Sequence, residues 1–115
     1  MNRTAVITGL GATTPIGGDV PTLWRNALAG TPGARPLEQD WVAEYELPVT
    51  FAAQLSSPVA DSLTKVEMKR MDPTTQFGVV AAREAWADAG LAGEGTVDPD
   101  RFAVAFGTGI GGVWT

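Results

Sequence analysis

The 115-residue sequence contains no cysteine and no histidine. Without cysteine the chain can form no disulfide bond, and without either residue it can hold no metal through thiolate or imidazole ligands. The same absence excludes cysteine–histidine and serine–histidine–aspartate catalysis by these residues alone. We therefore expect no catalytic residue, no metal ion and no cofactor within this segment.

Basic residues are also scarce. Eight Lys and Arg stand against 13 Asp and Glu, which gives a net charge of -5, and this balance argues against a general nucleic-acid binder. No apolar run approaches the roughly 20 residues of a membrane span. The N-terminus lacks the charged start, apolar core and cleavage site of a signal peptide. We expect a cytoplasmic protein that binds neither nucleic acid nor membrane.

The hydrophobic pattern, with 44% hydrophobic residues, predicts an α/β fold in one small domain. Asp and Pro residues mark two helix starts, and Gly residues mark their ends. The expected elements are a strand at 5–7, a helix over 19–30, an irregular stretch at 31–60 with short extended pieces such as "PVTFAAQL", helical segments divided at Asp72–Pro73, and a strand at 102–106.

The second helix of that last pair, which begins after Asp72, is apolar on most of its sides, and this pattern predicts deep burial. Two strands without clean alternation suggest a parallel sheet covered on both faces. Two strands are too few to cover such a helix. We therefore expect partner strands beyond Thr115, so that the chain is the front part of a larger protein.

Two glycine-rich stretches invite a nucleotide-binding interpretation. In "VITGLGATTPIGG" the third glycine of the dinucleotide fingerprint is replaced by Thr14, and Pro15 stands where the helix should begin. The stretch "GTGIGG" is followed by no Gly-Lys-Ser/Thr, so it is not a P-loop. It could cradle a phosphate through its backbone amides, but four glycines in six residues more simply indicate close backbone approach.

The stretch "KVEMKR" concentrates Lys65, Lys69 and Arg70 against the acidic background. Lys65 and Lys69 are four residues apart and share one face of a helix. A solvated surface helix is the simpler interpretation of this stretch. The functional alternative is a docking site for an acidic partner, in which charge speeds and orients the encounter.

Three stretches together are similar to one family. "VITGLGATTPIG", "KRMDPTTQFGVVAAREAWADAGL" and "VAFGTGIGG" occur in this order and resemble the N-terminal part of β-ketoacyl-[acyl-carrier-protein] synthases of the ketosynthase II type. The resemblance implies a thiolase-like fold, of which residues 1–115 would be an incomplete N-terminal domain, part of a layered α/β/α half. It also implies a homodimer when the protein is full length.

The resemblance further implies the reaction. These enzymes condense an acyl thioester with malonyl–acyl carrier protein, with loss of carbon dioxide, in fatty acid or polyketide elongation. Their cysteine nucleophile and two histidines would follow beyond Thr115, so the segment alone should be inactive. By the same resemblance, Ile110 would line the acyl-chain pocket, and Lys65, Lys69 and Arg70 would meet the acidic carrier protein.

Two alternatives remain open at this point. A chain-length factor of polyketide synthesis has the same fold without the nucleophile, and a stand-alone binding module would dock an acidic partner through residues 65–70. The stand-alone module predicts a cooperatively folding monomer. The synthase segment instead predicts exposed apolar surface around Val104, Phe106 and Ile110.

Overall fold

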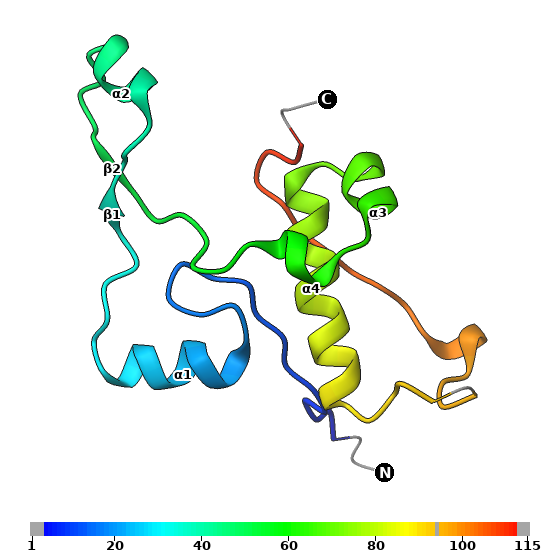
Figure 1. Ribbon diagram of the computed structural model, residues 1–115. Coiled ribbons are helices and arrows are strands. Elements are labelled where there is room, and N and C mark those ends of the chain that lie inside the picture. The colour runs from blue at the N-terminus through cyan, green and yellow to red at the C-terminus, as the bar shows by residue number, and fades with distance from the viewer. Residues whose placement is uncertain (1–3, 94, 113–115) are drawn as a thin grey trace. The chain divides into compact units, whose positions relative to one another are not determined.

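The computed structural model describes residues 4–93 and 95–112, and the chain divides into two compact units (Figure 1). Unit 1 comprises Met1–Ala12 and Val59–Thr115, and unit 2 comprises Thr13–Pro58. The elements of each unit follow from local capping and turn chemistry, and we describe the units separately.

The first helix of unit 2 forms as predicted. Helix α1 spans Val20–Leu28, and the Asp19 carboxylate accepts a hydrogen bond from the Thr22 N–H at 2.7 Å. This bond satisfies one of the amides that a helix N-terminus leaves unpaired. Gly30, with φ of +67°, follows the helix in the left-handed conformation that glycine tolerates best.

Unit 2 also contains a two-stranded antiparallel hairpin. Strands β1 (Arg35–Pro36) and β2 (Phe51–Ala52) pair, and a short helix α2 (Asp40–Glu44) lies between them in the chain. Strand β2 confirms the extended piece expected in "PVTFAAQL". Helix α2 was not predicted, because no side chain caps its start and five residues carry too little periodicity to detect. Val42 on α2 is buried, at 7% exposure.

Unit 1 is built around helix α4, which spans Pro73–Asp88. The Asp72 carboxylate accepts hydrogen bonds from the Thr75 N–H at 3.1 Å and the Thr75 hydroxyl at 2.7 Å, which confirms the predicted cap. The shorter elements of this unit are the 3-10 turn η1 (Val59–Ser62), helix α3 (Lys65–Arg70) and the 3-10 turn η2 (Pro99–Arg101).

Both strands predicted for unit 1 are wrong in this structure. Residues 5–7 and 102–106 run as coil, and the one sheet found within the described residues is the antiparallel hairpin of unit 2, not a parallel sheet. A strand needs a neighbouring backbone to complete its ladder. The second segment lies instead along α4: Phe102 meets Trp86 edge to face, with ring centroids 5.4 Å apart.

The N-terminal segment is fixed to α4 by backbone contacts. The Leu10 N–H donates to the Asp88 carboxylate at 2.9 Å, and the Ala12 N–H donates to the Glu84 carboxylate at 2.8 Å. Gly9 and Gly11 alternate with these two residues. A Cβ at Gly11 would lie 1.8 Å from the Ala81 carbonyl oxygen, so only glycine allows this approach.

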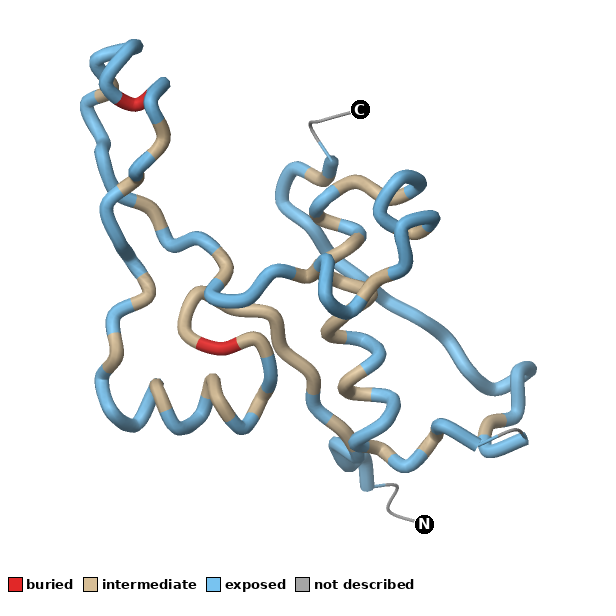
Figure 2. Tube along the Cα trace, in the orientation of Figure 1, coloured by how far each residue is buried: buried red, intermediate tan, exposed pale blue. Residues whose placement is uncertain are grey.

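Apolar side chains are widely exposed in both units. The predicted deep burial of α4 is wrong, since none of its residues is buried and Trp86 is 36% exposed. The trace in Figure 2 is accordingly mostly exposed or intermediate, with few buried positions. Among the described residues, no sheet covers the apolar sides of this helix. In the part of the chain that the structure describes, no helix combines the length and hydrophobicity needed to cross a membrane.

Candidate functional site

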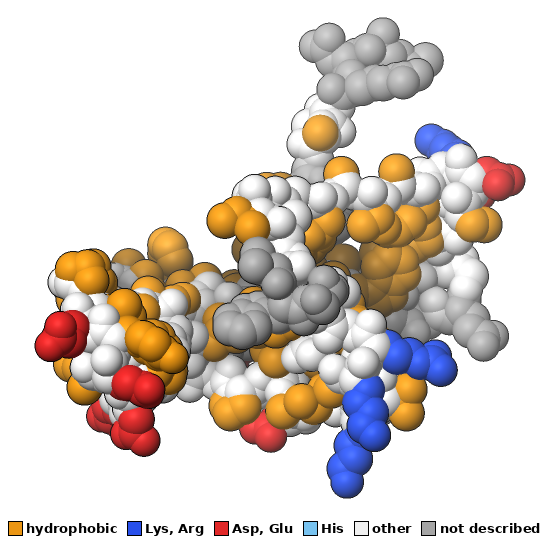
Figure 3. Space-filling view, turned by 90° about the horizontal axis from the view of Figure 1, so that it is seen from above, with side chains coloured by type: hydrophobic (Ala, Val, Ile, Leu, Met, Phe, Trp, Pro, Cys, Tyr) orange, Lys and Arg blue, Asp and Glu red, His pale blue; other side chains and the backbone are white. Residues whose placement is uncertain are grey.

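Helix α3 brings together the three basic residues that the sequence analysis selected. Lys65 begins the helix, Lys69 follows one turn later, and Arg70 ends it; all three are exposed. In the space-filling view, Lys and Arg side chains lie close together on one part of the visible face (Figure 3). Three cations on six consecutive residues present a compact positive surface in a chain of net charge -5.

The acidic residue within this helix is fully engaged. Glu67 and Thr64 form a capping box: the Thr64 N–H donates to Glu67 Oε2 at 2.8 Å, and the Glu67 N–H donates to Thr64 Oγ1 at 3.3 Å. The other carboxylate oxygen, Oε1, forms an ion pair with Arg83 of α4. Hydrogen bonds from Arg83 and then from Thr64 lower the pKa of Glu67 to about 2. The negative charge of Glu67 is therefore neutralised by contacts within the protein, mainly with Arg83.

The C-terminal end of α3 is held by a second side chain from α4. Gln76 Nε2 donates to the Met71 carbonyl at 2.9 Å and to the Met68 carbonyl at 3.2 Å. Carbonyls at the end of a helix have no partner within the helix, so this amide satisfies groups that would otherwise need water. Helix α4 thus contacts both ends of α3 through polar side chains.

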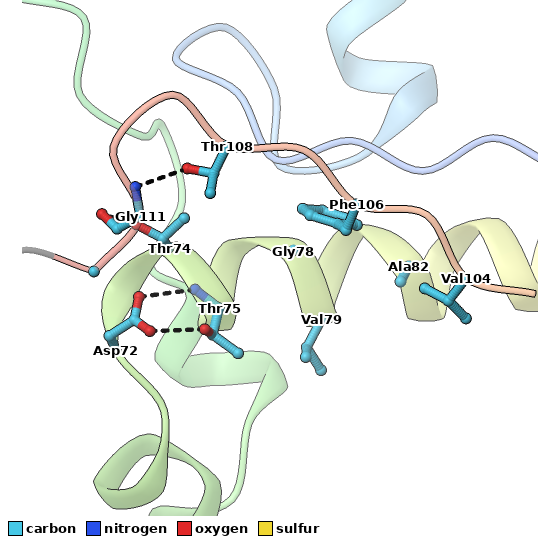
Figure 4. Close-up of a pocket in the computed structure, with 11 residues that line it drawn as sticks. Asp72, Thr74, Thr75, Gly78, Val79, Ala82, Val104, Phe106, Thr108 and Gly111 are labelled. Atoms are coloured by element: carbon cyan, nitrogen blue, oxygen red, sulfur yellow. Dashed lines mark hydrogen bonds between the residues drawn. The ribbon is translucent and has the colours of Figure 1, made fainter.

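A groove lies between α4 and the segment that leads into the glycine loop (Figure 4). It encloses about 420 Å³, and its apolar lining comes mainly from Val79, Ala82, Val104 and Phe106. The Phe106 ring lies over Gly78, where a Cβ would come within 2.8 Å of the ring. The groove therefore offers apolar surface and space, and neither cysteine nor histidine is among its lining residues.

The glycine loop closes one end of this groove. The Gly111 N–H donates to Thr108 Oγ1 at 3.0 Å, and the Thr74 hydroxyl of α4 donates to the Gly111 carbonyl at 3.3 Å. Gly111 has a φ of +80°, which glycine adopts without strain. Asp72 also lines the groove, and hydrogen bonds from Thr75 lower its pKa.

Ile110 lies at the tip of this loop and is 85% exposed. It is not among the residues that line the groove, although Thr108, Gly111 and Gly112 on either side of it are. The role of Ile110 in an acyl pocket therefore stays a prediction.

Sequence reasoning missed Arg83 and Gln76. The pattern Thr64-x-x-Glu67 is the signature of a capping box and would have predicted the start of α3. The contacts of Arg83 and Gln76 join different helices, with Arg83 16 residues from Glu67. No local pattern predicts such pairs.

Comparison with known proteins places the chain in a family. The model of the β-ketoacyl synthase N-terminal domain matches residues 2–114, which include α3, α4 and the glycine loop. The chain therefore belongs to the β-ketoacyl synthase family, and the resemblance seen in its motifs is confirmed.

Similar curated proteins include 3-oxoacyl-[acyl-carrier-protein] synthase 2 of Staphylococcus aureus (strain COL), which is 44% identical over 99% of this chain and 27% of its own length. The synthase of the same name from Mycobacterium bovis (strain ATCC BAA-935 / AF2122/97) is 34% identical over 92% of this chain and 25% of its own length. The chain thus spans about a quarter of the length of these relatives.

Proposed function

We propose that this chain is the N-terminal segment of a condensing enzyme that extends acyl chains carried on acyl carrier protein. The observation that carries the proposal is the family match across residues 2–114, together with relatives named 3-oxoacyl-[acyl-carrier-protein] synthase 2. The whole enzyme would have the thiolase-like layered α/β/α fold and act as a homodimer. The exposed apolar segments of unit 1 support this, because they would need further strands to cover them.

In this proposal the chemistry takes place outside these residues. The acyl group would be held as a thioester on a cysteine, and malonyl–carrier protein would lose carbon dioxide to give the carbanion that attacks it. Backbone amides would stabilise the oxyanion, and two histidines would support the decarboxylation. Since the sequence has neither Cys nor His, the cysteine and histidines belong to the rest of the enzyme.

Within the segment we assign two binding roles. Ile110 on the glycine loop would contact the acyl chain, next to the apolar groove that Val104 and Phe106 line. Lys65, Lys69 and Arg70 would dock the acidic carrier protein, and their exposure on α3 supports this assignment. Charge at such a rim acts mainly on the association rate.

The first test is to read the gene past codon 115 and to assay the full-length product. A continuing frame with a cysteine and two histidines, and condensation of an acyl thioester with malonyl–carrier protein, is the expected result. A frame with another residue at the cysteine position, and no condensation, would favour a chain-length factor. A stop codon at this point would overturn the enzyme proposal for this gene product.

The docking assignment has its own test in the full-length enzyme. Charge reversal at two positions, Lys65→Glu with Lys69→Glu, should raise the KM for carrier-protein substrates at least several-fold at low salt. The KM for a small thioester without the carrier protein should stay unchanged. Equal KM values for both substrates in the double variant and the parent enzyme would remove α3 from the docking surface.

A further inference from the structure

Helix α3 is too short to hold its own position. It has six residues, and helices of this length are unstable alone in water because nucleation is costly. None of its residues is buried, and its apolar side chains Val66 and Met68 are 58% and 38% exposed. Apolar packing therefore contributes little, and the polar contacts from α4 must determine where the three cations lie.

Two side chains of α4 supply those contacts, one at each end of α3. Arg83 pairs with Glu67 in the first turn and also donates to the Ser62 carbonyl at 3.3 Å, just before α3. Gln76 donates to the Met68 and Met71 carbonyls at the other end. We call Arg83 and Gln76 together the α4 clamp.

We infer that the α4 clamp positions α3 for the carrier protein, so that Arg83 and Gln76 control carrier-protein affinity without contacting the carrier protein. This inference rests on the docking role proposed above for Lys65, Lys69 and Arg70. When α3 is already fixed in place before the partner arrives, less conformational entropy is lost on binding. Loss of either clamp residue should therefore weaken binding even though the three cations remain.

The sign of the change in carrier-protein affinity caused by Glu67→Gln distinguishes positioning of α3 from an effect of net charge alone. The change removes a negative charge next to the three cations, and glutamine can still serve in a capping box. If only net charge mattered, the more positive surface would bind the acidic carrier protein more tightly. If the clamp positions α3, loss of the Arg83 ion pair should weaken binding despite the added positive charge.

The experiment compares full-length enzyme variants with carrier-protein substrate and with a small thioester. We expect Glu67→Gln, Arg83→Gln and Gln76→Met each to raise the KM for carrier-protein substrate about twofold to fivefold, the range that one exposed ion pair or hydrogen bond gives. The kcat and the KM for the small thioester should not change. The double variant Glu67→Gln/Arg83→Gln should weaken binding no more than Arg83→Gln alone, because Glu67→Gln breaks an ion pair that Arg83→Gln has already removed.

Asp61→Asn is the matched control. Asp61 lies on η1, is exposed, and forms no side-chain hydrogen bond or ion pair with other described residues. Its substitution adds the same unit of charge near α3 and leaves the clamp intact, so the KM for carrier-protein substrate should fall or stay the same. Thermal melting of every variant shows whether the enzyme still folds.

The outcomes separate the two proposals. If Glu67→Gln tightens binding as Asp61→Asn does, the positioning inference is wrong and the docking surface stands. If charge reversal at Lys65 and Lys69 has no effect either, the docking role itself fails. A rise in KM for both substrates would show that the clamp supports the whole fold and not α3 in particular, which also overturns the inference.

Discussion

At the scale of single residues, glycine matters here because it has no side chain. Gly11 meets α4 so closely that an added Cβ would overlap the Ala81 carbonyl oxygen, which is backbone and cannot rotate away. At Gly9 the corresponding clash is with the Ala85 carbonyl oxygen, at 2.2 Å. Both glycines face the helix in the same way, so each sets the distance between the N-terminal segment and α4.

Gly11→Ala should therefore destabilise the full-length protein by about 1–3 kcal/mol, the usual cost of overpacking. Chemical denaturation measures the change in the free energy of unfolding. Gly93→Ala is the control, because a Cβ there would meet only the Thr96 methyl group at 3.4 Å, an ordinary contact. Equal stability of the two variants would show that the segment does not rest on α4 as described.

Glu67 makes the stability of the fold depend on pH, and the sign of this dependence follows from its pKa. The folded-state pKa of about 2 lies below the ordinary value of 4.5, so the charged form is favoured by folding. Its contribution is complete above about pH 4.5 and is lost as the pH falls toward 2. The structural consequence is local, since the Glu67 carboxylate joins α3 to α4.

The backbone amides of α3 should therefore be less protected from hydrogen exchange at pH 2.5 than at pH 5, once the rates are corrected for intrinsic exchange. In Glu67→Gln the protection should be lower than in the parent protein at pH 5 and should change little on acidification. Asp61→Asn should keep the parent's pH dependence. Protection in α3 that is the same at both pH values in the parent protein would contradict the role given to this carboxylate.

At the scale of elements, the sequence predicted what local chemistry determines. The starts of α1 and α4 follow from Asp19 and Asp72, each with a proline in the next turn, and both helices form as expected. The strands at 5–7 and 102–106 were predicted wrongly because a strand depends on a partner backbone elsewhere in the chain. Helix α2 was missed because it is short and its start is not capped by a side chain.

The candidate site shows the same division. The cluster of cations on α3 could be read from six consecutive residues, and so could the glycine loop. The α4 clamp could not, because Arg83 and Gln76 reach α3 across a turn and only the folded chain places them there.

Packing of Phe106 on α4 provides a contrast to Gly11. A Cβ at Gly78 would come within 2.8 Å of the Phe106 ring, but this ring is 69% exposed and can swing aside. Gly78→Ala should cost less than Gly11→Ala, under about 1 kcal/mol, since alanine also favours the helix over glycine. Loss of the nuclear Overhauser contact between residue 78 and the Phe106 ring would report the displacement. An unchanged contact would contradict it.

At the scale of the whole molecule, the main feature is uncovered apolar surface. Ile7, Val104, Phe106 and Ile110 are 82%, 77%, 69% and 85% exposed, which confirms the exposure expected around the last three. Figure 3 shows hydrophobic side chains spread over the visible face. Exposed apolar surface of this kind is typical of an interface, or of a sheet face, in the absence of the partner that covers it.

The 115 residues expressed alone should therefore bind a dye for apolar surfaces and associate with increasing concentration. Per mole, dye binding should exceed that of the full-length protein, and Val104→Ser with Ile7→Ser should reduce it. Fluorescence titration and light scattering measure the two effects. A monomer that melts cooperatively and binds no dye would instead support the stand-alone module.

The contacts between the N-terminal segment and α4 also impose an order on folding during synthesis. Leu10 and its partner Asp88 are 78 residues apart, and Ala12 and Glu84 are 72 apart. The capping bonds of α1, α3 and α4 span three residues each and can form soon after those residues leave the ribosome. At about 5–20 residues per second, several seconds pass between the synthesis of residues 10–12 and that of their partners on α4. Residues 10–12 are therefore made before α4 but settle only after it has formed.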